Sequence, residues 1–367
     1  MIRVLKGTDR VLFGVVGFLV IFGLLILASA SMGYSIQKFG NPYRSIVHQL
    51  VFGVGVGVFL FWTGLKIPIS WYKRWAPHLL VISIALLLLV FVPKIGFSIG
   101  GARRWIHVGP FSFQPSELLK LTVVVYLAAW MHSRQKEISS FTLGFIPFLL
   151  ITGIVSIFLY REPDIGTLGV IALTSLGIFL LGGGRASQAA VAVLLGIVIL
   201  AIIIAAEPYR RDRFFVFLNP DTEIQGRGYQ MYQARIAIGS GGLFGRGLGL
   251  SRQKYSYLPE PMGDAIFAVY AEEFGFIGIA VLLSAFFFLF IRGMLVAART
   301  HDSFARLFAA GIAFLVISQV IINVGALSGV IPLTGIPLPF VSYGGTALAF
   351  LLFEMGILLN ISKRKIL

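Results

Sequence analysis

The stretch PEPMGDAIFAVYAEEFG at residues 259–275 opens a long apolar run and yet carries the carboxylates Asp264, Glu272 and Glu273. A carboxylate in the hydrocarbon layer costs about 2.5–3.5 kcal/mol on insertion scales, so it usually faces a polar cavity with a function. Asp264 stands at the mouth of the expected helix, where it could cap free backbone amides. Partial desolvation there would also raise its pKa toward the range of a general base, and the two roles are compatible. Glu272 and Glu273 lie two to three turns deeper, and we interpret them as structural acids paired with an arginine or a lysine.

Clustered cations form the second group of candidate residues. Arg211 and Arg213 belong to the run PYRRDRFFVFLNP, and their guanidinium groups match the oxygens of a pyrophosphate. Contact with lipid headgroups is the alternative for at least some of these arginines. Arg104 and Lys120 flank the start of another apolar run and could present positive charge to a phosphate. Glu117 lies three residues before Lys120, so the two share a helix face, and a simple local ion pair stays an open alternative.

Two polar segments complete the candidate binding set. Residues 228–250 begin with tyrosines at helical spacing around Gln233, which predicts a short amphipathic helix at the membrane interface. The glycines that follow lack the strand and the Gly-Lys-Ser/Thr sequence of a nucleotide loop. Residues 325–350 are rich in proline and glycine around Ser342, and non-helical backbone at this depth is tolerated where it lines protein or a cavity. Gln233 and Ser342 are therefore candidate substrate-binding residues.

The composition shows which elements must position these side chains. The chain has 367 residues, of which 57% are hydrophobic and 12% charged, whereas soluble domains carry about 25% charged residues. We predict an all-α integral membrane protein, a single polytopic domain over residues 1–367 with about ten transmembrane helices. The predicted spans are 10–31, 45–65, 77–96, 115–132, 142–160, 164–182, 187–206, 264–293, 304–329 and 340–361. Cysteine is absent and the five histidines are scattered, which excludes thiol chemistry and gives no support to a metal site made of protein ligands alone.

The distribution of charge predicts the orientation. The loops on the side of both termini hold most of the lysines and arginines of the short loops, so the positive-inside rule makes both termini cytoplasmic. One long external loop, at about 207–263, then joins the seventh and eighth helices. Most of the acids lie in external loops or near them, which concentrates polar chemistry outside. The net charge of +15 is spread over short loops between apolar helices, so anionic lipids are the expected partners rather than nucleic acid.

Several motifs resemble those of the SEDS family (shape, elongation, division and sporulation proteins), and the likeness runs over nearly the whole chain. The family signature is matched by Asn323, Gly329, Pro332, Gly335 and residues 342–346 (SYGGT); further matches are RWI (104–106), FQPSELLK (113–120), PDIGT (163–167), YRRDR (209–213), AIGSGGLFGRG (237–247), and LPE with DAIFA (258–268). The FQPSE motif and the chain length look more like the RodA branch than the FtsW branch. Two positions differ from many members: His107 stands where an aspartate is common, and Met262-Gly263 where His-Thr is common, so no role is carried over to them.

The resemblance implies a peptidoglycan glycosyltransferase for cell elongation in the bacterial cytoplasmic membrane, with its active site on the external face. It would polymerise lipid II, an undecaprenyl-pyrophosphate disaccharide-peptide, beside a class B penicillin-binding protein that cross-links the product. The family's catalytic aspartate maps onto Asp264, and its important basic residues map onto Arg104 and Lys120. Mg²⁺ or Mn²⁺ could bridge the pyrophosphate oxygens. A lipid II flippase is the main alternative, and a non-catalytic scaffold for the penicillin-binding protein is a third.

Overall fold

The computed structural model describes residues 7–99, 102–108, 111–218, 226, 228–255 and 257–363. Helices occur at all ten predicted spans, which confirms an all-helical membrane protein. They are α1 (Arg10–Phe39), α2 with η1 and α3 (Arg44–His48, Gln49–Gly55 and Val56–Lys66, continuous), α4 (Ile69–Leu89), α5 (Pro115–Ser133), η2 with α6 (Phe141–Phe145 and Ile146–Arg161), α7 (Ile165–Leu181), α8 (Ala186–Ala206), α11 (Ile266–Ala298), α12 (Ser303–Leu327) and α13 (Gly345–Ser362). Part of the predicted 207–263 loop, at 219–225, 227 and 256, lies outside the described residues.

Eight of these helices, within the described ranges, are long and apolar enough to cross a membrane. Two do not meet both conditions. The helix α7 has only 17 residues, and α5 carries Glu117 and Lys120 in its first turns. Most residues of α5 are buried against neighbouring helices, whereas α7 buries one face and exposes Leu173, Leu180 and Leu181 on the other.

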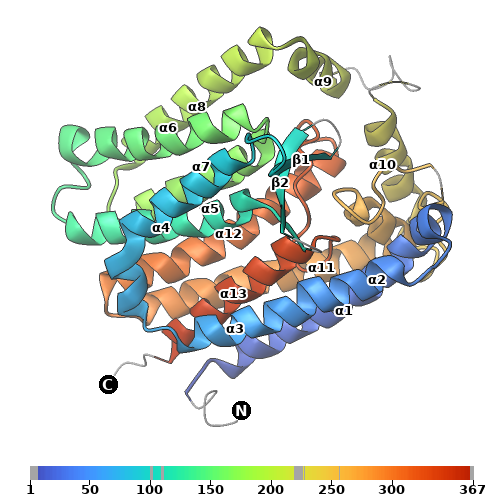
Figure 1. Cartoon of the computed structure of the whole chain (residues 1–367), viewed down its shortest axis with the longest axis horizontal. Helices are drawn as coiled ribbons and strands as arrows, with labels where there is room; N and C mark the ends of the chain where they lie inside the picture. Colours follow the sequence, from blue (N-terminus) through green and yellow to red (C-terminus); the bar gives the residue numbers. More distant parts are fainter. Residues whose placement is uncertain are drawn as a thin grey trace.

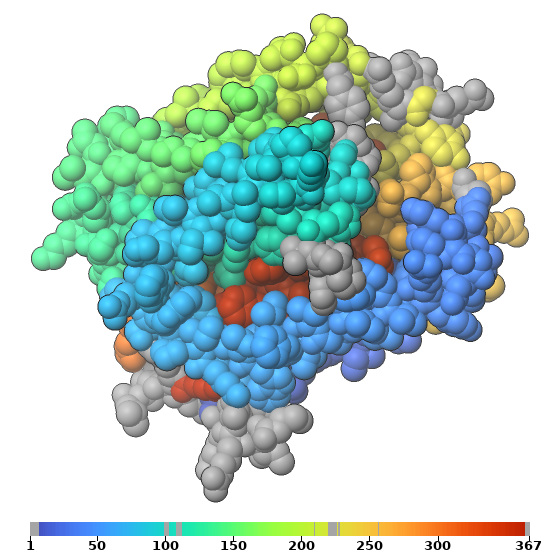
Figure 2. All heavy atoms as spheres, viewed as in Figure 1, coloured from blue at the N-terminus to red at the C-terminus, as the bar shows by residue number. Residues whose placement is uncertain are grey.

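The helices α12 and α13 lie at the centre of the bundle. The most apolar window of α12 is 78% buried, whereas that of α8, at the outer edge in Figure 1, is 6% buried. The helices α3 and α13 approach closely because each has glycine at the contact: a Cβ on Gly64 would lie 2.7 Å from Phe353 O, and one on Gly356 would lie 2.2 Å from Phe61 O. Small residues that allow such backbone approach drive helix association in membranes. In Figure 2, red atoms of the C-terminal part of the chain are visible in a gap between the blue and teal elements of the first third of the chain.

A small sheet was not predicted from the sequence. Strands β1 (Gly96–Ile99), β2 (Ala102–Val108) and β3 (Phe111–Phe113) form an antiparallel sheet in that order, in the segment that leads to α5. The register pairs Gly96 with Ile106, and Ile106 with Phe113. Pro115 stands in the first turn of α5, as predicted, because its missing N–H needs no partner there. The sheet therefore places Arg104, in β2, at one end of the bundle.

The described parts of the 207–263 segment contain two helices, α9 (Pro208–Leu218) and α10 (Tyr229–Ser240). The helix α10 confirms the predicted short helix, but its buried face consists of Met231, Ala234 and Ala237 and not of the tyrosines. It packs against α11 and α12.

Both ends of the described chain lie together (Figure 1). The backbone N–H of Asp9 donates to Ser362 Oγ at 3.1 Å, and the Asp9 carboxylate pairs with Arg292 near the end of α11. Asp264 precedes the first residue of α11 and so lies at the opposite end of the bundle from the termini. The prediction that both termini share one side is consistent with this arrangement.

Candidate active site

Contacts from α12 and from the loop 328–344, which joins α12 to α13, fix the turn that carries Asp264. The side-chain nitrogen Nδ2 of Asn323 donates to Asp264 O at 2.8 Å and to Ile336 O at 2.7 Å. The hydroxyl of Ser342 donates to Gly263 O at 2.7 Å. Because the constraints act on backbone atoms, they position the Asp264 side chain without occupying its carboxylate.

The carboxylate of Asp264 has few partners of its own. Gln230 Nε2, on α10, lies 3.3 and 3.4 Å from the two carboxylate oxygens. The backbone N–H of Ala265, the N-cap residue of α11, also favours the ionised carboxylate, but no side chain among the described residues caps the first amides of the helix. The backbone of the loop comes close on another side: a Cβ on Gly335, whose φ is +73°, would lie 3.8 Å from Oδ2.

Burial raises the pKa of Asp264 to about 6, and the negative charge of Glu260 adds to the effect. The Gln230 amide and the positive charge of Arg213 act in the opposite direction and lower this pKa in part. The group is therefore ionised at neutral pH and yet basic enough to accept a proton from a substrate. These are the properties that a general base needs.

A cavity with about 160 Å³ of empty space adjoins this carboxylate, and we call it the Asp264 cavity. Its lining comes from α12, the loop 328–344 and the turn before α11: Asp264, Asn323, Ala326, Leu327, Leu333, Thr334, Gly335 and Ile336. Arg213 Nη1, on α9, donates to Leu333 O at 3.5 Å, so a guanidinium group stands at the rim.

Lys120 lines a second cavity, which we call the inner cavity, with about 360 Å³ of empty space that includes space open to solvent. Its Nζ lies 2.9 Å from Glu117 Oε2 and 2.9 Å from Gln319 Oε1, and the residue is 3% exposed. Ser342 and Glu354 line the same space. The predicted pairing of Glu117 with Lys120 is thus observed, and the loop 328–344 contributes to both cavities, with Ser342 bonded back to the Asp264 turn.

Arg104 lies apart from both cavities. Its Nε donates to Glu162 O at 3.4 Å, and Nη2 donates to Pro163 O. Within the described ranges, both carboxyl oxygens of Glu162 are buried without a hydrogen-bond partner, and burial, with Asp164 nearby, raises the pKa of Glu162 to about 9. Glu162 is therefore neutral at neutral pH, and it does not cancel the charge of Arg104.

The structure brings together only part of the predicted set. Asp264 and Arg213 share one site, and Ser342 supports its backbone, whereas Lys120 with Glu117 faces the inner cavity and Arg211 is exposed. On α10, the glutamine that contacts Asp264 is Gln230, one turn before the predicted Gln233. Sequence reasoning missed Gln230 because a polar residue in a surface helix carries no signal of the carboxylate that it meets.

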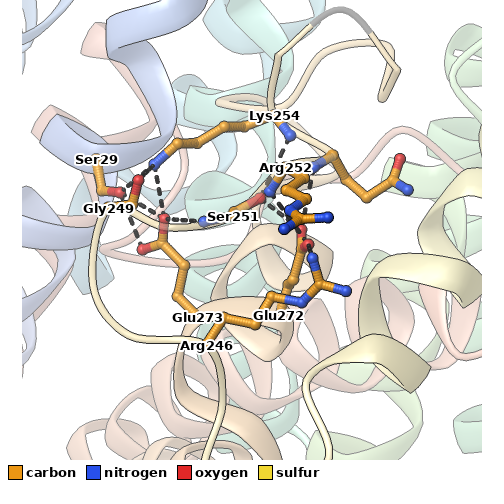
Figure 3. A network of polar contacts seen from close by, with 9 residues as sticks. Ser29, Arg246, Gly249, Ser251, Arg252, Lys254, Glu272 and Glu273 are labelled. Carbon is orange, nitrogen blue, oxygen red and sulfur yellow. Dashed lines mark hydrogen bonds and ion pairs between the residues drawn. The ribbon is translucent and has the colours of Figure 1, made fainter.

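The deeper acids are structural, as expected, and Figure 3 shows their contacts. Glu273, 1% exposed, pairs with Lys254 Nζ at 2.7 Å, and its two oxygens accept from Ser29 Oγ at 2.7 and 2.9 Å. Glu272 pairs with Arg246 at 3.2 Å and accepts from Ser251 Oγ at 2.6 Å. These contacts hold the glycine-rich segment that follows α10 against α11 and α1.

The comparisons with known proteins agree with this architecture. A family model described as cell cycle protein, covering FtsW, RodA and SpoVE, matches residues 9–366. Stage V sporulation protein E of Bacillus subtilis is 39% identical over 355 residues, which cover 97% of each chain. A probable peptidoglycan glycosyltransferase FtsW of Coxiella burnetii is 40% identical over 347 residues, or 94% of this chain and 93% of that one.

Two solved structures are similar over nearly their full length. One is described as the structural coordination of polymerization and crosslinking by a peptidoglycan synthase complex; its chain has a TM-score of 0.78, 27% identity and 97% coverage of both chains. The rod shape determining protein RodA of Thermus thermophilus has a TM-score of 0.73 and 27% identity, and covers 98% of this chain and 97% of its own. The fold and the site thus define a multi-pass helical membrane protein with a carboxylate site at one end of the bundle. The chain belongs to the FtsW/RodA/SpoVE family, the SEDS proteins.

Proposed function

We propose that this protein is a peptidoglycan glycosyltransferase that polymerises lipid II, with Asp264 as the general base. The observation that carries the proposal is the partly desolvated carboxylate of Asp264, which has a pKa of about 6 and opens onto a cavity at one end of the bundle. Relatives named as probable peptidoglycan glycosyltransferases support the reaction type.

The reaction is a single displacement. Asp264 takes the proton from the 4-hydroxyl of the acceptor's N-acetylglucosamine, and that oxygen attacks the anomeric carbon of the donor. The bond from this carbon to the pyrophosphate oxygen breaks, and undecaprenyl pyrophosphate leaves with the electron pair. Configuration at the carbon is inverted. No second acid is needed, because pyrophosphate leaves without being protonated, in contrast to the leaving group of a glycoside hydrolase.

Cations near the site stabilise the charge that develops on the leaving group. Arg213 stands at the rim of the Asp264 cavity, and the exposed Arg211 shares its helix. Arg104 keeps a charge that the neutral Glu162 does not offset. Lys120 is held by Glu117 and Gln319, so binding of a phosphate to Lys120 requires one of these contacts to open.

A divalent cation would act through the substrate. Among the described residues, no group of three or more histidine, cysteine, aspartate or glutamate side chains is placed to hold a metal ion. Mg²⁺ or Mn²⁺ would therefore be held mainly by pyrophosphate oxygens, where it would neutralise charge. Titration of the purified protein with EDTA and then with each metal tests this requirement.

We place the site on the external face of the bacterial cytoplasmic membrane. The positive-inside rule puts both termini in the cytoplasm, and Asp264 lies at the end of the bundle away from them.

The proposed partner is a class B penicillin-binding protein, in line with the similar chain from a complex for polymerization and crosslinking. For the cellular role, the RodA-like motifs favour elongation, while the named relatives include an FtsW and a stage V sporulation protein. Expression of this chain in a rod-shaped host that lacks either its RodA or its FtsW separates these roles.

The decisive experiment compares wild type with Asp264→Asn, purified as the full chain with and without the co-expressed penicillin-binding protein. Lipid II is added in detergent and the products are separated on a gel. We expect Asp264→Asn to lose about 10²- to 10⁴-fold in polymerisation rate, with lipid II binding and thermal stability retained. Polymer yield near wild type from the variant would reject the role of Asp264.

The same preparation separates the other functions. If the wild type makes no polymer but moves lipid II from one leaflet of a vesicle membrane to the other, the protein is a flippase. Absence of both, with the penicillin-binding protein still bound, would identify a scaffold.

A further inference from the structure

Two residues that line the Asp264 cavity each carry a side-chain oxygen with no hydrogen-bond partner among the described residues. These oxygens are Oδ1 of Asn323 and Oγ1 of Thr334, and both atoms are buried. Asn323 is 2% exposed. A buried polar atom without a partner destabilises the fold, so two of them on residues that line one small cavity point to a ligand that satisfies them.

The contacts of Asn323 fix which end of its amide is free. Its nitrogen lies between two backbone carbonyls, Asp264 O at 2.8 Å and Ile336 O at 2.7 Å. A carbonyl oxygen accepts and never donates, so this end must be the N–H₂ group. The free atom is consequently an oxygen that can only accept, while the Thr334 hydroxyl can both donate and accept.

A bare metal ion fits this wall poorly, although three oxygen-bearing side chains line it. The Gln230 amide N–H₂ group already faces both oxygens of Asp264, and the positive charge of Arg213 acts on the same carboxylate. The partial positive charge of the Gln230 N–H₂ group and the full charge of Arg213 would both repel a cation bound to Asp264. A neutral group that donates one hydrogen bond and accepts another satisfies Asn323 and Thr334 together. A water molecule has this character in the free protein, and an alcohol hydroxyl of a bound substrate has it when it displaces that water.

We propose that Asn323 and Thr334 form a subsite for the hydroxyl vicinal to the attacking one, the 3-hydroxyl of the acceptor sugar. This hydroxyl donates to Asn323 Oδ1 and accepts from Thr334 Oγ1. The inference rests on the proposed function for the identity of the sugar, and it adds a positioning role. With the neighbouring hydroxyl held in this subsite, the 4-hydroxyl is the one presented to Asp264, which makes the polymer linkage regular.

The loop 328–344 links the position of the subsite to the position of Asp264, the proposed base. Gly335, next to Thr334, approaches Asp264 Oδ2, and Ile336 shares the amide of Asn323 with Asp264. A shift of this loop would therefore move the subsite and the base together.

The test uses Thr334→Val, which removes the hydroxyl and nearly preserves shape. The full chain with its co-expressed penicillin-binding protein is given ordinary lipid II as donor and fluorescent acceptors whose terminal N-acetylglucosamine is intact, 3-deoxy or 6-deoxy. We expect wild type to use the 3-deoxy acceptor about 10- to 100-fold less well than the intact one, because Asn323 and Thr334 are then left unpaired. In Thr334→Val we expect a lower rate with the intact acceptor and a clearly smaller difference between the two acceptors.

Thr174→Val is the matched control. The Thr174 hydroxyl is also buried without a partner, but it lies in α7 and lines neither cavity. Both variants should keep or raise the melting temperature, since each removes a buried unpaired group, and only Thr334→Val should change acceptor discrimination. Thr334→Ser, which restores a hydroxyl, should recover discrimination against the 3-deoxy acceptor.

Equal discrimination by wild type and Thr334→Val would overturn the subsite, and so would loss of rate with the 6-deoxy but not the 3-deoxy acceptor. These failures are separate from failure of the proposed base. If Asp264→Asn still polymerised while Thr334→Val lost discrimination, Asp264 would be rejected as base and the hydroxyl subsite would stand.

Discussion

The acids at the start of α11 fall into two regions with opposite environments. Glu272 and Glu273 are buried and each accepts hydrogen bonds from several donors, and Lys254 Nζ has contacts with Glu273, Ser29 Oγ at 2.9 Å and Gly249 O at 2.8 Å. Asp264, about two turns earlier, has the Gln230 amide at 3.3 and 3.4 Å, the backbone N–H of Ala265 and a cavity beside it. The difference separates acids that stabilise the fold from an acid that is kept available for chemistry.

The energetic consequences of the two environments have opposite sign. A buried ion pair with every lone pair satisfied resists the loss of either partner. The pKa of Asp264 is instead raised, so the folded state binds its proton more tightly than the unfolded state does, and the stability from this group is lost as pH rises toward about 6. At neutral pH the ionised Asp264 therefore destabilises the fold, as expected of a functional group.

The largest expected effect comes from breaking the paired region. Lys254→Met leaves Glu273 buried without its counter-charge and should lower the free energy of unfolding by about 3–5 kcal/mol. Thermal unfolding of the purified protein in detergent measures the change. Lys136→Met, at an exposed lysine, is the control, and the double variant Lys254→Met with Glu273→Gln should recover part of the loss. An unfolding temperature for Lys254→Met equal to that of wild type would contradict the structural role.

An intermediate effect is expected from pH in the Asp264 region. The base acts when deprotonated, so the polymerisation rate should be constant above about pH 7 and fall about tenfold per unit below about pH 6. Initial rates at saturating lipid II, with binding followed in parallel, measure this profile. A rate unchanged between about pH 7 and about pH 5 would show that Asp264 is not the titrating base.

The smallest expected effect comes from Gln230, the residue of α10 that contacts the Asp264 carboxylate. Gln230→Ala removes the N–H₂ group that favours the ionised carboxylate, so the acidic limb of the rate profile should move to higher pH. At about pH 6 this should lower the rate about two- to fivefold. Gln233→Ala is the matched change one turn further along the helix and should leave the profile in place. Equal shifts in the two variants would mean that the observed contact does not tune Asp264.

The sequence predicted most of the helical framework because apolar runs long enough to span a bilayer are a local property. It also indicated Asp264, since a carboxylate at the start of such a run is costly without a purpose. The pairing of Glu117 with Lys120 followed from spacing within one helix and is observed at 2.9 Å. The small sheet from Gly96 to Phe113 was missed because short strands next to apolar helices leave no clear alternation.

Local pattern thus determined the class of protein, its spans and the acid at the helix mouth. Only the tertiary structure decided that Lys120 faces the inner cavity, that Gln230 and not Gln233 meets the carboxylate, and that Asn323 and Thr334 line the same cavity as Asp264. These relations join residues far apart in the chain, from α10, α12 and the loop 328–344. The spacing of residues along one helix cannot encode them, because they arise only when separate helices pack and bring their polar positions to the same end of the bundle.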